Sequence, residues 1–571
     1  MPLTLSAGSR RFGLPALALA AALAGAGPEA VASPQPNIIG PFFAGVVAGH
    51  RGDAAAAADY LVELAGRIDP IADVLEPAVG AAISAGRIDQ ALPLAQVLLE
   101  IQPQGSETAA LLLLAEAARQ GDWETARRMI GHLPTHDLSG TQRQMLEAWV
   151  LLPQEGVEAA LAALAPLAQR RGLAGLHALH EAMLLDVAGS PEAAEAYTRA
   201  LESQNPPSGR AVLLASNHLA RSGKVAEAEA LIRAQLDAGR GNATLVGILE
   251  ELEAGAPQQP MVPDAAGGLS EVFLQIGAAL AEEQPGEMAL REARLALLAS
   301  PRNSAAGLLL GEVLSRIGRH EEAVAAYAAL LDDPRHGPVA ALGRADSLAA
   351  SGRIDEALEA YREIAAADPA DPEPSIRMGN LLRWERRFGE AVAAYDEAVA
   401  RLPDRHPGDW LLYYFRGIAN ERAGNWQAAE TDLQEALTLN PEQPQVLNYL
   451  GYSWVEQQRN LDLALDMLQR AVNQRPRDGY IVDSLGWALF RLGRYEEAVD
   501  ELERAVELEP GQAVINDHLG DAYWRVGRQR EARVQWQRTL SLGDDPDVDA
   551  GTVRQKLRQG LPAAPADSGA D

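Results

Sequence analysis

Few residues of this chain combine into a pattern that could do chemistry. The 571 residues contain no cysteine, which excludes disulfides, thiolate nucleophiles, iron–sulfur clusters, cysteine-bound zinc and a lipid anchor on cysteine. His177 and His180 stand three residues apart, so on a helix they would share a face. A zinc site needs three or four converging ligands, and no third ligand accompanies them. We therefore expect both histidines to be partly exposed helix residues and predict no metal site.

Other catalytic patterns are incomplete. The only lysines, Lys224 and Lys556, lack the glycines of a phosphate-binding loop. The stretch Gly451–Val455 places Ser453 in half of a nucleophile elbow, but the second glycine is missing and the surrounding pattern is helical. We predict no catalytic or cofactor-binding residue, no cofactor, and a protein that is not an enzyme.

The charge excludes two kinds of binding protein. The chain has 49 basic and 79 acidic residues, a formal net charge of −30. Nucleic-acid binding and polybasic attachment to membranes both require a basic surface. We expect no nucleic-acid partner. No stretch after the N-terminus is long and apolar enough to span a bilayer, so we expect no transmembrane helix in the mature chain.

Three residue types recur through the second half of the chain about every 34 residues. The alanines have spacings of 34, 34, 34, 38, 35, 34 and 34 and are Ala289, Ala323, Ala357, Ala391, Ala429, Ala464, Ala498 and Ala532. Twelve or thirteen residues earlier come Gly277, Gly311, Ala345, Gly379, Gly417, Gly451, Gly486 and Gly520. The repeating prolines are Pro301, Pro369, Pro403, Pro441, Pro476 and Pro510.

These positions predict repeated helix pairs. The small residues allow two antiparallel helices to approach closely, and a proline cannot continue the second helix. One pair cannot bury its apolar face alone, so neighbouring pairs must stack. Four residues, 406–409, lengthen one spacing to 38, and segment 457–461 carries one extra residue. Both irregularities are typical of loop insertions.

This pattern resembles the tetratricopeptide repeat (TPR) family. The best unit runs from Gly479 to Gln512, with Leu485-Gly486 in the first helix, Tyr495 after the turn, and Ala498, Ala505 and Pro510 in and after the second helix. The resemblance implies an all-α fold: an α-solenoid, a right-handed superhelix of antiparallel helix pairs, here in two blocks.

The first half of the chain repeats less regularly. The alanines expected after its turns are Ala57, Ala91, Ala126, Ala159, Ala193 and Ala228, spaced 34, 35, 33, 34 and 35. The spacing then breaks, because Ala228 and Ala289 are 61 residues apart. Three prolines and three glycines between residues 255 and 268 predict a linker at this break.

The predicted organisation follows from these boundaries. It comprises a signal peptide at 1–32, degenerate TPR-like repeats at 33–254, a linker at 255–269, eight units (270–303, 304–337, 338–371, 372–405, 410–443, 444–478, 479–512 and 513–546), a capping helix at 547–561 and a disordered tail at 562–571.

The N-terminus predicts export. Arg10 and Arg11 precede an apolar run from Leu14 to Ala26, and Ala30-Val31-Ala32 offers a small-residue cleavage site, the layout of a secretory signal peptide. We expect cleavage near Ala32 and a periplasmic location. An uncleaved anchor or an unstructured tail is the alternative for this segment.

Aromatic residues gather near the C-terminus. Fifteen of the 28 Phe, Trp and Tyr residues lie between Trp410 and Trp536, and aromatic side chains supply much of the energy of interfaces. In TPR arrays the second, fifth, ninth, twelfth and thirteenth positions of each first helix line a concave groove. Through this resemblance we expect a partner-binding groove that includes Tyr414, Arg422, Asn448, Tyr452, Tyr480, Asp483, Trp487, Phe490, Arg491, Asp517, Asp521, Trp524 and Arg525.

The polar groove positions indicate what would bind. Asn448, Asp483 and Asp517 occupy fifth positions, where acidic groups would repel a partner's terminal carboxylate. We therefore expect a protein partner of unknown identity that presents a segment with apolar and basic side chains. The predicted function is a non-enzymatic protein–protein interaction scaffold in the bacterial cell envelope. The alternatives are a cytoplasmic TPR adaptor with a false signal peptide and a non-catalytic subunit of an envelope enzyme complex.

Overall fold

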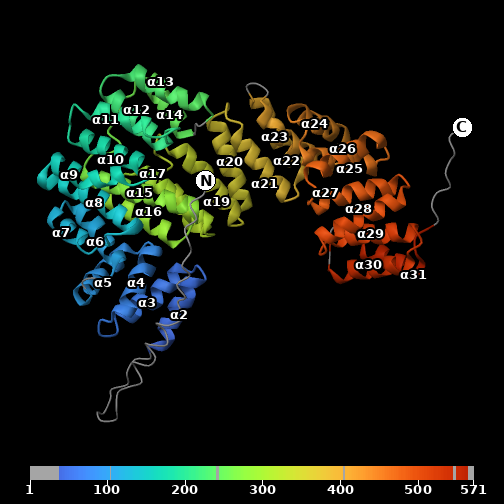
Figure 1. Cartoon of the computed structure of the whole chain (residues 1–571), viewed down its shortest axis with the longest axis horizontal. Coiled ribbons are helices and arrows are strands. Elements are labelled where there is room, and N and C mark those ends of the chain that lie inside the picture. Colours follow the sequence, from blue (N-terminus) through green and yellow to red (C-terminus); the bar gives the residue numbers. More distant parts are fainter. Residues whose placement is uncertain are drawn as a thin grey trace, which may run out of the picture. The chain divides into compact units, whose positions relative to one another are not determined.

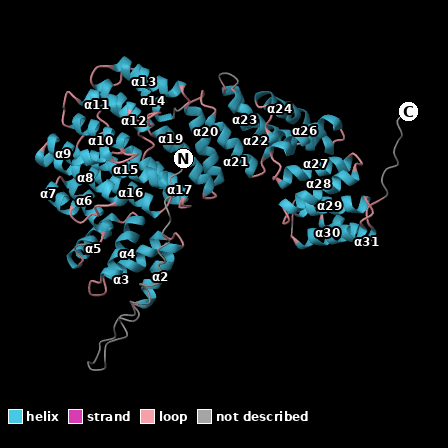
Figure 2. Ribbon diagram, in the orientation of Figure 1, coloured by secondary structure: helices cyan, strands magenta, loops and turns pink. Residues whose placement is uncertain are grey.

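The computed structural model of the chain describes residues 38–102, 105–239, 243–402, 406–543, 545 and 548–562. Every regular element in these residues is a helix, and no strand occurs among them (Figure 1, Figure 2). The prediction of an all-α solenoid of antiparallel helix pairs is confirmed. The expected signal peptide, residues 1–32, and positions 563–571 of the expected tail lie outside the described residues.

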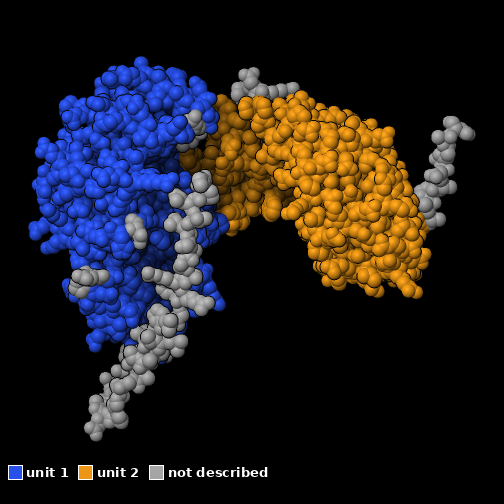
Figure 3. Space-filling view, viewed as in Figure 1, with its two compact units in different colours: residues 1–336 blue, residues 337–571 orange. Residues whose placement is uncertain are grey.

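The chain divides into two compact units, residues 1–336 and 337–571 (Figure 3). This boundary is about 70 residues after the expected linker, because the first two helices that follow the linker pack against helices of the N-terminal half.

Unit 1 is a series of helix pairs in which each helix packs mainly on the next one along the chain. Its helices are α2 (Ile39–His50), α3 (Ala54–Ala65), α4 (Ala72–Ser84), α5 (Ile88–Ile101), α6 (Glu107–Gln120), α7 (Trp123–Ile130), α8 (Asp137–Glu155), α9 (Val157–Leu164), the 3-10 helix η1 (Ala165–Gln169), α10 (Ala174–Val187), α11 (Ala193–Glu202), α12 (Gly209–Arg221), α13 (Val225–Asp237), α14 (Ala243–Glu253), α15 (Ala265–Glu283), α16 (Glu287–Ala299), α17 (Ser304–Arg316) and α18 (His320–Ala328).

The alanine repeat of unit 1 marks contacts between paired helices, with one correction. Five of the six expected alanines are buried, but Ala159 is partly exposed and its neighbour Ala160 is fully buried. The frame therefore passes through Ala160. The error arose because helix α9 is rich in alanine, so that adjacent alanines match the spacing almost equally well.

Helices α15 and α16 do more than continue the row of pairs, because they also pack against helices much earlier in the chain. Helix α15 lies against α6 and α8, and α16 lies against α4 and α6. The buried Glu292 of α16 accepts a hydrogen bond from Gln142 of α8, with 2.6 Å between Nε2 and Oε2. The N-terminal helix pairs thus bury apolar surface against α15 and α16.

The expected linker is shorter than predicted. Helix α15 begins at Ala265, and Asp264 caps it by accepting a hydrogen bond from the Gly267 N–H at 2.8 Å. Residues 265–269 are therefore helical. Gly268 serves packing instead of chain flexibility, since a Cβ there would lie 2.1 Å from the ring of Trp149 in α8.

Unit 2 continues the helix pairs with greater regularity. Its helices are α19 (Gly337–Ala350), α20 (Ile354–Ala367), α21 (Glu373–Trp384), α22 (Phe388–Arg401), the 3-10 helix η2 (Pro407–Asp409), α23 (Trp410–Arg422), α24 (Trp426–Leu439), α25 (Pro444–Glu456), α26 (Leu461–Gln474), α27 (Gly479–Arg491), α28 (Tyr495–Leu508), α29 (Ala513–Arg525), α30 (Gln529–Ser541) and α31 (Ala550–Gln559).

The midpoint glycines lie where a large side chain of the paired helix crosses. A Cβ on Gly379 would lie 2.5 Å from the Tyr395 ring, and a Cβ on Gly520 would lie 2.5 Å from the Trp536 ring. Tyr395 and Trp536 are fully buried. The absence of a side chain at these glycines therefore lets an aromatic ring of the paired helix pack directly against the backbone.

The two insertions are accommodated between helices. Residues 406–409 contain the short 3-10 turn η2. The Asp409 carboxylate accepts a hydrogen bond from the His406 N–H, and the His406 ring accepts one from the Gly408 N–H before α23 begins. The extra residue before α26 is absorbed by Gln458 and Asn460, whose φ values are 54° and 47°. Non-glycine residues adopt this left-handed conformation at some cost.

The C-terminal end of unit 2 is covered by α31, which packs on α30 and falls within the expected capping segment 547–561. Val553 of α31 is buried, whereas Arg554 and Arg558 are exposed. In the part of the chain that the structure describes, we find no helix with the length and apolar character needed to cross a bilayer.

Candidate partner-binding surface

The expected partner-binding residues lie on four consecutive first helices of unit 2: α23, α25, α27 and α29. Helices α25 and α27 contact each other, as do α27 and α29, so their residues form one surface. The expected side chains that are at least partly exposed and lie away from the cap are here named the first-helix surface: Tyr414, Arg422, Asn448, Tyr452, Tyr480, Trp487, Phe490 and Arg491.

Trp487 is the centre of this surface. Its ring stacks on Phe490 at 4.8 Å and on His518 at 4.0 Å, with interplanar angles of 10° and 14°. The indole N–H donates to Glu456 Oε1 at 2.7 Å, and Arg491 donates to the same oxygen at 3.1 Å. These contacts hold a large, partly exposed ring in one orientation, which lowers the entropy cost of binding to it.

His518 stacks on the Trp487 ring and forms an ion pair with Asp483. Its Nδ1 lies 3.0 Å from Asp483 Oδ1, and both side chains are buried. Burial opposes the imidazolium, but the carboxylates of Asp483, Asp517 and Asp521 outweigh it and raise the pKa of His518. Asp483 was expected to face a partner; the structure pairs it with His518 inside unit 2.

A second aromatic group lies on α23 and α25. Tyr414 contacts Trp410, Phe415 and Tyr449 at centroid distances of 6.1, 5.5 and 6.0 Å. The Tyr449 hydroxyl donates to Glu421 at 3.1 Å. At the end of α23, Arg422 is exposed and lies 3.5 Å from Glu421. Tyr414 is therefore anchored among neighbouring rings, and only part of it is accessible.

Two amide oxygens of α25 are buried without a donor. Among the described residues, no group donates to Gln445 Oε1 or to Asn448 Oδ1. A buried polar atom that lacks a hydrogen bond costs about 1–3 kcal/mol. Asn448 is one of the expected groove residues, and Gln445 lies at the second position of the same helix, but both oxygens are enclosed by the chain's own atoms and do not face solvent.

Four expected residues, all on α29, contact the chain's own C-terminus. Lys556 of α31 donates to Asp517 at 2.7 Å and to Asp521 at 2.8 Å. A Cβ on Gly560 would lie 1.8 Å from the Trp524 ring, and Arg525 donates to the Pro562 carbonyl at 2.7 Å. The cap thus covers this part of the expected surface. Lys556 is one of only two lysines in the chain, and it was the one feature of the sequence that could have indicated this contact.

One conspicuous residue was missed by the sequence analysis. Trp384 ends α21 and is 79% exposed, more than any other large hydrophobic residue in the described part of the chain. It occupies the thirteenth position of the unit 372–405, a groove position in the TPR pattern. Beside it, Arg383 stacks over the Phe415 ring at 4.3 Å, so α21 extends the aromatic surface toward α23.

The chemistry-bearing residues of the sequence have structural roles. His180 was expected to be partly exposed, but it is fully buried and lies 3.0 Å from Trp149 Nε1, whose N–H points to its Nδ1. Burial lowers the pKa of His180 to about 4. Ser453 lies inside α25. Across residues 38–562, where described, no group of three or more potential ligands is placed to hold a metal.

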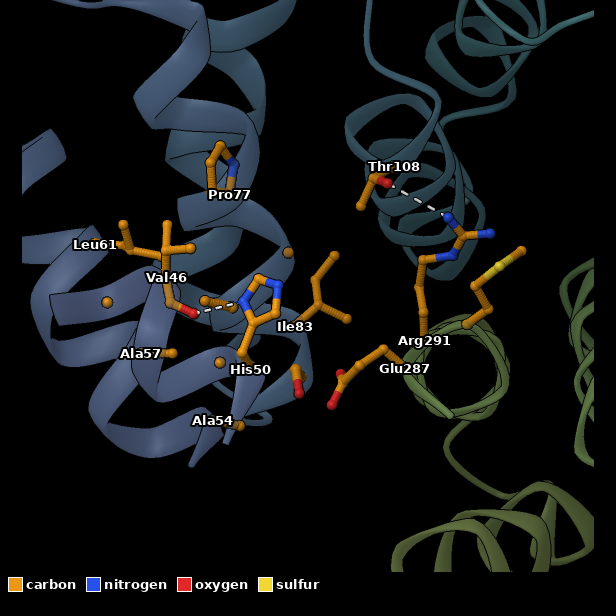
Figure 4. A pocket seen from close by; sticks show the side chains of 16 residues that line it. Val46, His50, Ala54, Ala57, Leu61, Pro77, Ile83, Thr108, Glu287 and Arg291 are labelled. Carbon is orange, nitrogen blue, oxygen red and sulfur yellow. Dashed lines mark hydrogen bonds between the residues drawn. The ribbon is translucent and has the colours of Figure 1, made fainter. Parts of the chain in front are cut away.

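Unit 1 contains an apolar cavity that sequence reasoning did not find. It has a volume of about 530 Å³ and lies between α2 to α4 on one side and α6 and α16 on the other (Figure 4). Val46, Leu61 and Ile83 line it, and Glu287 and Arg291 stand on the α16 side. The glycines Gly45, Gly49 and Gly80 among its lining residues were the only signal in the sequence.

Comparison with protein families identifies the repeat. A family model described as tetratricopeptide repeat matches residues 184–243, 289–338, 308–372, 376–445 and 416–481, and one described as TPR repeat matches 486–527. Together these ranges cover just over half of the chain. They include one repeat of the irregular N-terminal half.

Individual relatives are more distant. TPR repeat-containing protein PA4667 of Pseudomonas aeruginosa is 29% identical over 94 residues, which are 16% of this chain and 16% of that protein. The chain therefore matches about a sixth of that relative's length. Among solved structures, the Cut9–Hcn1 hetero-tetramer is 16% identical, with 92% of this chain and 97% of that chain covered and a TM-score of 0.36. YrrB, a TPR protein described as having an unusual peptide-binding site, is 24% identical, with 35% and 100% covered and a TM-score of 0.28.

Proposed function

The chain belongs to the tetratricopeptide repeat family, and on that premise we propose that it is a non-enzymatic scaffold that binds segments of partner proteins on the first-helix surface of unit 2. The observation that carries this proposal is the partly exposed Trp487 of α27, whose ring is held in one orientation by stacking on Phe490 and by its N–H bond to Glu456. Aromatic anchors of this kind dominate the energy of protein interfaces.

The partner segment should bring apolar side chains and hydrogen-bond donors. Trp487, Tyr452 and Tyr480 offer apolar faces, and the partly exposed carboxylates of Glu421 and Glu456 can accept hydrogen bonds from N–H groups. Basic side chains are still expected on the partner segment, but the aspartates of the expected groove are no longer the reason. His518 pairs with Asp483, and Lys556 alone bridges Asp517 and Asp521. The preference for basic side chains therefore rests on Glu421 and Glu456, whose carboxylates are partly exposed.

Capture of partners by the full chain tests the surface. We expect Trp384→Ala to weaken crosslinked capture without loss of the helical circular dichroism signal, because the ring is 79% exposed. Trp487→Ala combined with Tyr452→Ala should reduce capture about 30-fold, since truncating an interface tryptophan costs about 2 kcal/mol or more.

Val534→Ala is the matched control, because Val534 is 59% exposed on the second helix α30 and should leave capture unchanged. Unchanged capture by folded Trp384 and Trp487 variants would place the partner site elsewhere. Titration with basic and acidic peptides from a captured partner tests the segment chemistry: tighter binding of acidic C-terminal peptides would contradict it.

We further propose that the scaffold acts in the cell envelope after removal of residues 1–32. Arg10, Arg11, the apolar run and the small residues before Ser33 support export. Mass spectrometry of the mature N-terminus tests this location, with a chain that begins near Ser33 as the expected result. An intact N-terminus would favour the cytoplasmic adaptor, and recovery of one stoichiometric enzyme with the chain would favour the non-catalytic subunit.

A further inference from the structure

The first described helix of unit 1 exposes an apolar stripe. Ile39, Phe43 and Val47 of α2 stand four residues apart, so they share one face, and they are 53%, 45% and 45% exposed. Tyr60 of the neighbouring α3 is also 45% exposed. In Figure 1, α2 ends the row of unit 1 helices, and its contacts are with α3 and α4.

Helix α2 has little to stabilise it within one copy of the chain. It has 12 residues, among them Gly40, Gly45 and Gly49. Of all 12 residues, only Gly45 is buried. Helices this short are marginal in isolation, and each interior glycine costs about 1 kcal/mol relative to alanine. The inward face of α2 lines the 530 Å³ cavity through Val46 and His50, so packing on that side is also incomplete.

The first and last helices that the structure describes differ in their outer faces. Solenoids require terminal elements with a polar outer face to remain soluble, and α31 meets this requirement with exposed Arg554 and Arg558. Helix α2 instead presents three large apolar side chains. An apolar stripe of this kind is expected to be buried against another surface.

Charge indicates what covers it. Two copies of a chain with net charge −30 repel each other over most of their surface. Residues 30–52, which include all of α2, contain no aspartate or glutamate. Helix α2 therefore brings no acidic side chain of its own to a contact between two copies. An apolar stripe is also complementary to itself, as a two-fold interface requires.

The chain that precedes α2 in the mature protein is a poor alternative cover. Cleavage near Ala32, which belongs to the proposed function, leaves Ser33-Pro34-Gln35-Pro36-Asn37 before the helix. These residues are polar and include two prolines, so they supply no apolar face.

We propose that the mature protein forms a two-fold dimer through α2, in which Ile39, Phe43 and Val47 of one copy pack against the same residues of the other. A helix of 12 residues is about 18 Å long, so one face of α2 buries less than a standard interface of about 1,600 Å². The dimer is therefore a reversible one that dissociates at micromolar concentrations.

Sedimentation equilibrium of the chain lacking residues 1–32 tests the dimer. The weight-average mass should double as concentration rises from about 1 to about 100 µM, and Phe43→Asp should raise the dissociation constant at least tenfold. Val534→Asp, an exposed site outside α2, should leave the dissociation constant unchanged. A wild-type chain that stays monomeric to 100 µM, or a control that dissociates equally, overturns the proposal.

A second measurement covers the case in which Phe43→Asp fails to fold. The chain has no cysteine, so Val47→Cys provides one thiol per copy, and a short bismaleimide should link two copies through it. Val534→Cys should give no linked dimer. Absence of linkage through residue 47 overturns the proposal.

Vesicle flotation and partner capture separate the dimer from its alternatives. Flotation of the monomeric chain with neutral phosphatidylcholine vesicles, abolished by Phe43→Asp, would assign the stripe to a membrane and overturn the dimer. Partner capture by unit 2 does not use α2, so a monomer that still captures partners refutes this inference alone, whereas a dimer that captures nothing refutes the proposed function alone.

Discussion

At the scale of single residues, polar groups decide which parts of the surface are available. His518 and Lys556 pair with three aspartates on the first helices of unit 2, so these acids form contacts within the unit. The amide oxygens of Gln445 and Asn448 remain without donors in the described structure. These two oxygens are buried, so the candidate surface is defined by its partly exposed aromatic rings and by the carboxylates of Glu421 and Glu456 beside them.

His180 makes a pH-dependent contribution to stability. Its folded-state pKa is about 4, below the value of about 6.5 in an unfolded chain, so the unfolded state binds more protons between these two pH values. Stability is therefore complete above pH 6.5 and falls as the pH decreases toward 4, by roughly 3 kcal/mol.

The pH dependence can be measured by urea unfolding between pH 7 and pH 4. His180→Gln, which keeps an acceptor for the Trp149 N–H, should remove this part of the pH dependence. His177→Gln, one turn earlier on α10, should retain it. An equal pH dependence in wild type and His180→Gln would contradict the assignment.

At the scale of helices, the fold depends on how closely two helices of a pair approach. The midpoint glycines are matched to large residues of the second helix, such as Gly379 to Tyr395. The same repeat contains Gly389 near the start of α22, where an added Cβ would meet no atom within 4 Å. Two glycines ten residues apart therefore have opposite roles.

Substitution by alanine should separate these roles. Gly379→Ala should destabilise the chain by about 1–3 kcal/mol, because the added methyl group meets the buried Tyr395 ring. Gly389→Ala should be neutral or stabilising by up to about 1 kcal/mol, because alanine favours helix. Thermal unfolding measures both, and equal effects at the two sites would refute close packing as the reason for Gly379.

At the scale of the whole molecule, the two units cover their apolar cores in different ways. Unit 2 buries its core between successive pairs, and α31 covers the final pair. Unit 1 uses α15 and α16, which follow six N-terminal helix pairs and α14 in sequence, to cover α4, α6 and α8. The N-terminal pairs therefore depend on helices that come more than 100 residues later.

Truncation tests this dependence. Residues 337–571 should give a soluble, cooperatively unfolding domain, because their core and cap are internal. Residues 38–254 alone should be aggregated or lack a cooperative transition, because the surface that receives α15 and α16, including Trp149, becomes exposed. Extension to 38–336 should restore solubility. A native-like, cooperatively unfolding 38–254 would show that α15 and α16 are dispensable.

The amino-acid sequence by itself determined the helix pairs, their spacing and the family, because close-approach glycines, buried alanines and terminating prolines act within one repeat of about 34 residues. Only the tertiary structure decided the contacts between distant residues. Gly268 meets Trp149, Gln142 meets Glu292, and Ser84 accepts from Arg319 at 2.8 Å across 235 residues. The same long-range packing buried His180 and made 265–269 helical. Pattern within a repeat cannot encode such contacts, since each depends on which distant helices the solenoid brings together.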